Sequence, residues 1–189
     1  MTGAAWVDEG VVPSLPRWLL PLVAAVRTIE PGELSMFLPP DEGGRPGAVL
    51  ILFGDGENGP DVLLIERAAK MRSHPGQPAF PGGAVDSTDA SPTAAALREA
   101  QEETALDPLG VTVWATLPDL WLPPSGFVVT PVLGWWSSPS AIEIGDPAEV
   151  AAVHRVPIAD LVNPSNRVEV THRVGYVGPG FDTHGMVVW

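Results

Sequence analysis

The chain has 189 residues, 45% of them hydrophobic, which suffices for one substantial core and is too short for two comfortable domains. A formal net charge of -13 with only ten Lys and Arg argues against sequence-independent binding to nucleic acid, because such binding depends on clustered cations. The absence of cysteine excludes disulfides, thiolate nucleophiles and cysteine-based zinc sites.

The N-terminal part of the chain predicts an arm on a single domain. The 22 prolines and 20 glycines favour many turns between short elements, and so predict a mixed α/β architecture rather than a helical bundle. Residues 17–29 predict a helix with one apolar face, interrupted or kinked at Pro21. A turn-rich stretch follows. We therefore expect residues 1–45 to form an arm packed on one domain of residues 46–189.

The middle and the end of the chain predict a mixed sheet. Short apolar runs at 48–53 and 62–65, separated by a glycine-rich stretch, predict a β-hairpin. Similar runs, each bounded by Pro, Gly or Asp, predict further strands at 111–117, 127–135, 149–156 and 185–189.

Two helices are predicted between these strands. The longer runs from Pro92 to Thr104, with Ser91 as its N-cap and an alanine-rich first half. The shorter runs from Ile158 to Val162. Residues 1–12 lack the basic start of a signal peptide, and no apolar run reaches the roughly 20 residues of a membrane span. We therefore expect a cytoplasmic protein with no membrane or nucleic acid partner.

Three glutamates share one face of the longer predicted helix. Glu99, Glu102 and Glu103 stand at positions i, i+3 and i+4, so their carboxylates repel one another. A hard cation such as Mg2+ takes carboxylate oxygens and would turn this repulsion into binding. Taken alone, such a triplet is more often a solvated face. The preceding Gly82 and Gly83 favour a site, because glycine lets the backbone approach a ligand and Gly82 could offer its carbonyl oxygen.

Together these residues resemble the Nudix box, whose pattern is Gly, five residues, Glu, seven residues, Arg-Glu-apolar-x-Glu-Glu-x-Gly. The matching positions are Gly83, Arg98, Glu99, Ala100, Glu102 and Glu103. Asp89 stands where the box has its first Glu, eight residues separate it from Arg98 instead of seven, and Ala105 replaces the final Gly. These departures leave open whether Asp89 reaches the site or pairs with Arg98.

Two further segments resemble the coenzyme A pyrophosphatase branch of this family. Residues 67–77 look like the segment that precedes the box in that branch, and residues 125–131 look like its later strand motif. The first segment carries four side chains suited to phosphate groups, namely Arg67, Lys70, Arg72 and His74. The alternatives are an ordinary charged loop and, for His74, a structural histidine.

The resemblance implies a Nudix-type α/β/α sandwich around a mixed sheet and an enzyme that depends on Mg2+ or Mn2+. It implies hydrolysis of a nucleoside diphosphate linked to another group, with coenzyme A, cleaved to 3′,5′-ADP and 4′-phosphopantetheine, as the favoured substrate. The metal ligands would be Glu99, Glu102, Glu103 and Gly82. Arg98 would orient the acidic residues, and the general base would be Glu99 or Glu149, with Glu143 and Asp146 as neighbouring alternatives.

Several alternatives remain open at this stage. The substrate could be ADP-ribose, a dinucleoside polyphosphate or an oxidised nucleotide, or the chain could be a module that binds a small nucleotide without cleaving it. The oligomeric state is open between a monomer and a homodimer. We expect the tryptophans at 114, 121, 135 and 136 in the core and at sheet edges, and none of the seven in the site.

Overall fold

The computed structural model describes residues 4–70, 75–123, 125–171 and 177–189. The helices of this part are α1 (Leu20–Val26), α2 (Pro31–Leu34), α3 (Pro92–Thr104) and α4 (Ile158–Val162), with short 3-10 turns at Val12–Ser14, Arg17–Leu19, Pro108–Gly110 and Pro164–Asn166. The strands are β1 (Trp6–Val7), β2 (Arg45–Gly56), β3 (Gly59–Arg67), β4 (Pro78–Ala79), β5 (Gly82–Ala84), β6 (Val111–Thr116), β7 (Leu120–Leu122), β8 (Phe127–Trp136), β9 (Val150–Pro157), β10 (Arg167–Thr171), β11 (Val177–Thr183) and β12 (Met186–Val188).

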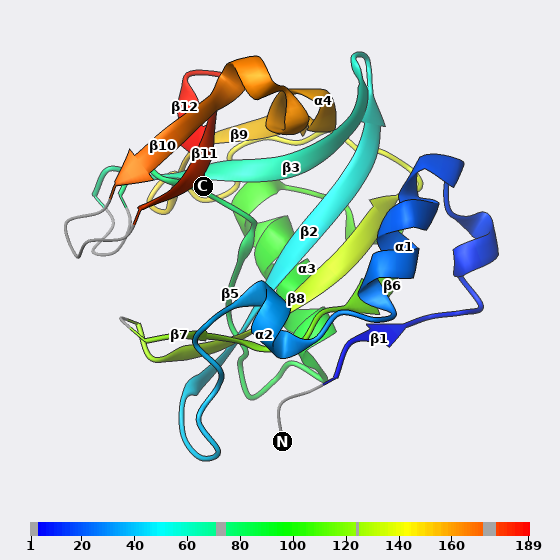
Figure 1. The fold of residues 1–189 in the computed structure, drawn as a ribbon, viewed down its shortest axis with the longest axis vertical. Coiled ribbons are helices and arrows are strands. Elements are labelled where there is room, and N and C mark those ends of the chain that lie inside the picture. Colours follow the sequence, from blue (N-terminus) through cyan, green and yellow to red (C-terminus); the bar gives the residue numbers. More distant parts are fainter. Residues whose placement is uncertain (1–3, 71–74, 124, 172–176) are drawn as a thin grey trace.

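The described strands form a nine-stranded mixed sheet and a separate three-stranded sheet (Figure 1). The main path runs β1-β6-β8-β2-β3-β4, with β5 paired to β2, β7 to β8 and β9 to β3. The β2–β8 pair is parallel, and the other recorded pairs of this sheet are antiparallel. The small sheet has the order β10-β11-β12.

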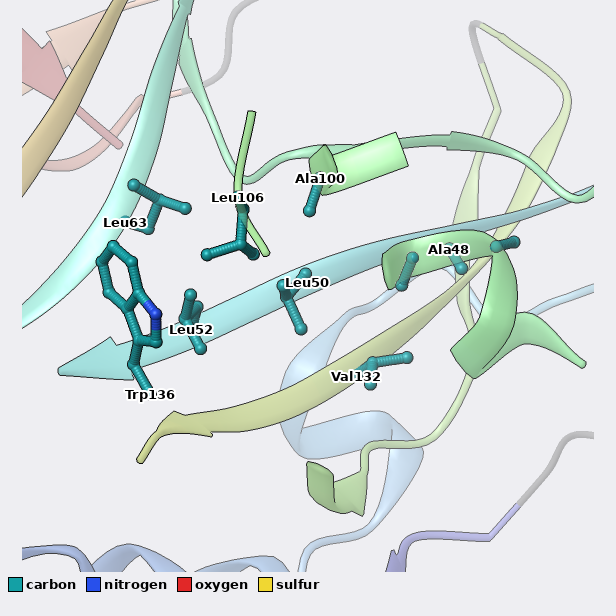
Figure 2. Close-up of a cluster of buried hydrophobic side chains, with 10 residues drawn as sticks. Ala48, Leu50, Leu52, Leu63, Ala100, Leu106, Val132 and Trp136 are labelled. Carbon is teal, nitrogen blue, oxygen red and sulfur yellow. The ribbon is translucent and has the colours of Figure 1, made fainter. Parts of the chain in front are cut away.

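The long β2 strand separates two apolar layers, because alternate side chains of a strand point to opposite faces. On one face Leu50 and Leu52 pack with Val132 of β8 and with Ala100 of α3 (Figure 2). On the other face Ile51 and Phe53 meet α1, the turn before it and α4. Helices therefore cover both faces of the sheet, which confirms the predicted mixed α/β fold.

The predicted hairpin is present and longer than expected. Strands β2 and β3 are joined at the Glu57–Asn58 turn, while Gly54 and Gly56, expected in the connection, belong to β2. A Cβ atom on Gly54 would lie 2.8 Å from Oδ1 of Asp61, so glycine here makes room for a neighbouring side chain rather than for a turn.

The helix predicted at 17–29 is present in part, but it is shorter and is neither interrupted nor kinked at Pro21. A 3-10 turn at Arg17–Leu19 leads into α1, and Pro21 lies in the first turn of α1. An N–H has no helical partner at that position, so proline begins the helix instead of bending it.

The helix that carries the acidic triplet has the predicted bounds, Pro92–Thr104. Its N-cap Ser91 accepts a hydrogen bond from the Ala94 N–H at 3.2 Å. At its other end Ala105 has a left-handed backbone with φ of 53°. Ala105 therefore makes the turn that glycine makes in the Nudix box, at a cost of about 1 kcal/mol. Among the described residues, no helix is both long and apolar enough to cross a membrane.

Candidate active site

A cavity of about 510 Å³ lies where β2, β3, β5 and β8 meet. Its charged lining comes from Arg67 at the end of β3, from Glu99 of α3, and from Glu149 just before β9. Gly82 and Gly83 of β5 line it between these side chains. The cavity thus gathers residues from the acidic helix, the glycine pair and the basic segment, which are far apart in the sequence.

Glu103 lies beside this cavity and is 3% exposed. Its Oε2 accepts a hydrogen bond of 2.9 Å from the Gly82 N–H. Burial raises the pKa of Glu103 to about 7; the Gly82 hydrogen bond and Arg67 oppose the shift, while Glu99 and Glu149 add to it. The carboxyl groups of Glu99, Glu103 and Glu149 are therefore close enough to repel one another.

Glu99 stands over β5, and only 16% of its side chain is exposed. A Cβ atom on Gly83 would lie 2.6 Å from the Glu99 carboxyl carbon, so the absence of a side chain at Gly83 lets this carboxylate approach the strand. Burial raises the pKa of Glu99, Arg98 lowers it, and Glu102 and Glu149 raise it further.

Arg98 binds three carboxylates at once. Its Nε and Nη2 donate to the two oxygens of Asp89, both at 3.0 Å, in the bidentate arrangement that suits guanidinium. Its Nη1 donates to Glu99 Oε1 at 2.8 Å and to Glu102 Oε2 at 3.3 Å, and Nη2 also donates to the Ala84 carbonyl at 3.1 Å.

The arrangement around Arg98 answers the question that the sequence left open about Asp89. Only 6% of its side chain is exposed, and its hydrogen bond from Arg98 lowers its pKa. Asp89 pairs with Arg98 and is not among the residues that line the cavity. Its carboxylate therefore holds the arginine that in turn contacts Glu99.

Gly82 and Ala84 of β5 present main-chain groups to α3. Residues 81 and 85 are hydrogen-bonded to β2, so by alternation along the strand the main-chain groups of Gly82 and Ala84 point away from β2. The Gly82 N–H accordingly binds Glu103, and the Ala84 carbonyl accepts from α3. The Gly82 carbonyl falls on the same side, where it could serve as a metal ligand.

The 143–149 loop contributes one acidic side chain to the cavity. Glu149 lines it, whereas Glu143 and Asp146 are not among the residues that do. The Asp146 carboxylate accepts the Ala148 N–H at 2.8 Å and so supports the turn before β9. Of the candidate bases in this loop, the geometry favours Glu149.

The basic segment divides into a part beside the cavity and a part outside the described residues. Arg67 lines the cavity, and its buried Nε has no hydrogen-bond partner among the described residues. Lys70 is exposed and is not among the lining residues. Arg72 and His74 lie outside the described residues, so their predicted contacts with substrate stay predictions.

The apolar residues of the cavity were not predicted from the sequence. Leu122, Phe127 and Val129 line it from the β7–β8 hairpin, and Trp189 lines it after β12. The expectation that no tryptophan belongs to the site is wrong for Trp189. Its proximity depends on the pairing of β12 with β11 and its packing near β4, which no local pattern reveals.

The acidic residues offer the type of ligand atom that a divalent cation prefers. Carboxylate and carbonyl oxygens are ligands that Mg2+ and Mn2+ prefer, and a cation would offset the burial and the smaller repulsion that together raise the pKa of Glu103. As they stand, no three His, Asp or Glu side chains in the described ranges converge closely enough to hold an ion. Glu102, with 58% of its side chain exposed, faces outward beside Arg98. Binding would therefore draw the carboxylates together.

A glycine-rich strand beneath a helix with an Arg-Glu-x-x-Glu-Glu run, inside a mixed α/β sandwich, defines the class of site found in Nudix proteins. The NUDIX domain family matches residues 44–174. The chain therefore belongs to the NUDIX domain family, as the sequence resemblance implies.

Relatives and solved structures agree with this membership. The chain is 49% identical over 121 residues to a protein of Enterobacter sp. (strain 638) described as "Uncharacterized Nudix hydrolase NudL", covering 64% of this chain and 62% of that protein. A protein of Cronobacter sakazakii with the same description is 52% identical over 101 residues, covering 53% and 52%. The chain thus matches only about half to three-fifths of the length of these relatives. A crystal structure of a Nudix hydrolase from M. smegmatis, RenU, superposes with a TM-score of 0.51 at 28% identity, covering 61% of this chain and 72% of that one.

Proposed function

We propose that this protein is a metal-dependent hydrolase of nucleoside diphosphates linked to a second group, with coenzyme A as the preferred substrate. The products would be 3′,5′-ADP and 4′-phosphopantetheine. The observation that carries the proposal is the single cavity that joins Arg67, Glu99 and Glu149 around the Gly82-Gly83 strand, beside the buried Glu103.

The charges in the cavity support a diphosphate as the group that is bound. Arg67 brings a guanidinium with a buried Nε that lacks a partner in the described part of the chain. A buried donor without a partner is costly, and a phosphate oxygen would supply the missing acceptor. Membership of the NUDIX family and the names of the relatives agree with hydrolysis of such a bond.

Each acidic residue has a role that follows from its surroundings. Glu103 is held by the Gly82 N–H and would bind the cation with Glu99, with the more exposed Glu102 and with the Gly82 carbonyl. A bound Mg2+ or Mn2+ would offset the phosphate charge and lower the pKa of an attacking water. Glu149 would accept the proton of that water, since it lines the cavity and is not held by Arg98 in the way Glu99 is.

The departures from the Nudix box do not disrupt the contacts of Arg98 or the end of α3. Asp89 still pairs with Arg98 despite the extra residue between them, and Ala105 still closes α3 in a left-handed conformation. A module that binds nucleotides without cleaving them would tolerate the loss of this Arg98-Glu99 contact, which measures 2.8 Å here. The intact contact favours an enzyme.

A product-resolved screen tests the proposal. Coenzyme A, NADH, ADP-ribose and an oxidised nucleoside triphosphate are incubated with the protein and either Mg2+ or Mn2+, and products are separated by chromatography. We expect coenzyme A to have the highest kcat/KM and to give 3′,5′-ADP, and turnover to stop when the metal is chelated. Turnover of ADP-ribose at roughly ten times the kcat/KM of coenzyme A, a gap of about 1.4 kcal/mol, would refute the assignment of substrate. Tight nucleotide binding with no turnover of any compound would refute catalysis.

A further inference from the structure

The largest apolar side chains of the cavity come from two places in the strand order, which define its two ends. Leu122, Phe127 and Val129 of the β7–β8 hairpin form one, and Trp189 lies at the other. The order of strands places these two groups apart. The β7–β8 hairpin lies on one side of β2, whereas Trp189 follows β12, which packs against β4 on the other side of β2, next to β3. In Figure 1 the C-terminal end and β7 accordingly lie on the same side of the molecule, above and below β5.

The charged groups of the cavity lie between these two ends. Glu99 stands over Gly83 of β5, which pairs with β2 in the middle of the path, and Arg67 and Glu149 come from β3 and the start of β9. A ligand that fills the cavity therefore needs a charged centre and a weakly polar arm at each end. A diphosphate substituted on both sides has this form.

We propose that Trp189 is a specificity-determining residue that stacks on the nucleobase arm of the substrate, while the β7–β8 hairpin packs on the other arm. This inference rests on the proposed function for the position of the diphosphate. Stacking on an indole requires a flat partner, and a nucleobase offers one. At the opposite end Leu122 and Val129 are aliphatic, and the ring of Phe127 already has the Arg45 guanidinium over it, 4.6 Å from the ring centroid. This end therefore suits a flexible chain without a ring.

Neighbouring residues support this assignment of the two ends. Arg67 ends β3, which lies between β2 and β4 in the strand order, so a phosphate on the ribose of the base arm would meet this cation between the centre of the cavity and Trp189. At the hairpin end, the Ser125 hydroxyl already donates to the Leu122 carbonyl at 3.2 Å. The Ser125 hydroxyl proton is therefore already used and does not recognise the edge of a base there.

Binding of the two halves of coenzyme A tests the inference without any need for turnover. Dissociation constants of 3′,5′-ADP and 4′-phosphopantetheine are measured with Mg2+ by calorimetric titration, for the wild type and for Trp189→Ala, Trp189→Leu and Trp189→Phe. Leu122→Ala is the matched control, since Leu122 and Trp189 are 45% and 48% exposed and neither change should unfold the chain. Inorganic pyrophosphate, which has no ring, is the control ligand.

We expect Trp189→Ala and Trp189→Leu to weaken 3′,5′-ADP roughly tenfold, Trp189→Phe to keep most of the affinity, and pyrophosphate binding to stay unchanged. Leu122→Ala should weaken only 4′-phosphopantetheine. Equal weakening of both halves by Trp189→Ala, wild-type affinity in Trp189→Leu, or no binding of 3′,5′-ADP by the wild type would each overturn the inference. If the wild type binds both halves but does not hydrolyse coenzyme A, the proposed function fails, and the pattern of affinities still decides the role of Trp189.

Discussion

At the scale of single residues, Glu103 is a carboxyl group placed where its charge is poorly tolerated. It is buried, it has Glu99 and Glu149 for neighbours, and a single main-chain N–H binds it. The surrounding fold therefore favours the protonated form until a cation arrives. This arrangement links the stability of the protein to pH and to metal.

The first prediction concerns this link. Burial raises the pKa of Glu103 from its ordinary value of 4.5 to about 7, so between these values the folded state holds a proton that the unfolded chain has released. Without metal, the free energy of unfolding should fall as pH rises through this window, by about 3 kcal/mol in all from this group. The measurement is urea unfolding in chelator at several pH values from 4.5 to 8.

Two variants isolate Glu103 in that series. Glu103→Gln should flatten the pH dependence and be more stable than the wild type at pH 8. Glu102→Gln, whose parent side chain is 58% exposed, should leave the dependence almost unchanged. Equal slopes in the wild type and Glu103→Gln would show that the buried carboxyl does not set the dependence.

The second prediction concerns Asp89 as a positioning residue. Asp89→Asn removes the charge that holds Arg98 by two hydrogen bonds of 3.0 Å, and Arg98 contacts Glu99. We expect kcat to fall by roughly tenfold to a hundredfold with little change in KM, because the geometry of the reacting groups changes while the binding surface does not. Asp86→Asn is the control, since Asp86 Oδ2 is 3.8 Å from Arg98 and its side chain is 64% exposed. Similar kcat values for the two variants would remove this role from Asp89.

The role of Asp89 shows what the sequence could and could not indicate at this scale. The spacing of Glu99, Glu102 and Glu103 predicts a common helix face, because that geometry is local. Whether Asp89 reaches Arg98 depends on the path of the loop before the helix, where one extra residue changes the geometry. The burial of Glu103 beside the exposed Glu102 depends on how α3 is rotated against the sheet, which no local pattern specifies.

At the scale of elements, predictions succeeded where the signal is contained in the segment itself. The bounds of α3 follow from Ser91, Pro92 and a run of strong helix formers, and those of α4 were also predicted. The hairpin follows from two apolar runs around a turn. Strands β4, β5 and β7, of two or three residues each, exist only because a longer strand pairs with them, so they were missed.

In the small sheet, β12 was predicted at 185–189, whereas β10 and β11 were missed for a related reason. Strand β10 alternates exposed and half-buried residues, and β11 contains Gly178, Pro179 and Gly180, which are poor strand formers. Pairing between β10 and β11 fixes them in the sheet despite this composition. Because the small sheet was not fully predicted, the position of Trp189, which follows β12 and lines the cavity, was not predicted either.

The third prediction concerns α3 as an acidic element. Replacing Glu102 and Glu103 together by Gln keeps side-chain size and removes the charges that would hold the metal. We expect turnover to fall about a thousandfold, which corresponds to roughly 4 kcal/mol of transition-state stabilisation. Stability without metal should be nearly unchanged at pH 4.5 and raised at pH 8, since the buried charge of Glu103 and the repulsion on one helix face are both removed.

Melting curves with and without Mg2+, beside an activity assay, test this prediction. Added Mg2+ should stabilise the wild type more than the double variant, as any ligand of the native state does. A second double variant, Glu42→Gln with Glu57→Gln, changes the net charge by the same amount at exposed positions and should behave like the wild type. Near-wild-type turnover after loss of Glu102 and Glu103 would mean that this helix face is only solvated.

At the scale of the whole molecule, the two faces of the sheet differ: one leads to the cavity and the other packs against the N-terminal segment. The face that carries α3 leads to the cavity, whereas the opposite face is covered by the N-terminal segment. There Leu19, Val23 and Val26 pack against Trp114 and Leu133. The division of the chain at residue 45 into an arm and a domain stays a prediction, and these contacts suggest how to test it.

The fourth prediction is that the N-terminal arm stabilises the fold without taking part in the reaction. Leu19 is 1% exposed within the cluster against Trp114, and the neighbouring Leu20 is 40% exposed. Leu19→Ala should lower the free energy of unfolding by about 2 to 5 kcal/mol, since it removes buried methyl groups and leaves a cavity, while Leu20→Ala should change it by less than about 1 kcal/mol. At a temperature where both variants are folded, kcat and KM should stay within about twofold of the wild type, because no residue of this cluster lines the active-site cavity. Urea unfolding followed by tryptophan fluorescence gives the stabilities, and the turnover assay is run on the same samples. A folded Leu19→Ala variant with much reduced kcat would show that the arm shapes the active site from the far face of the sheet.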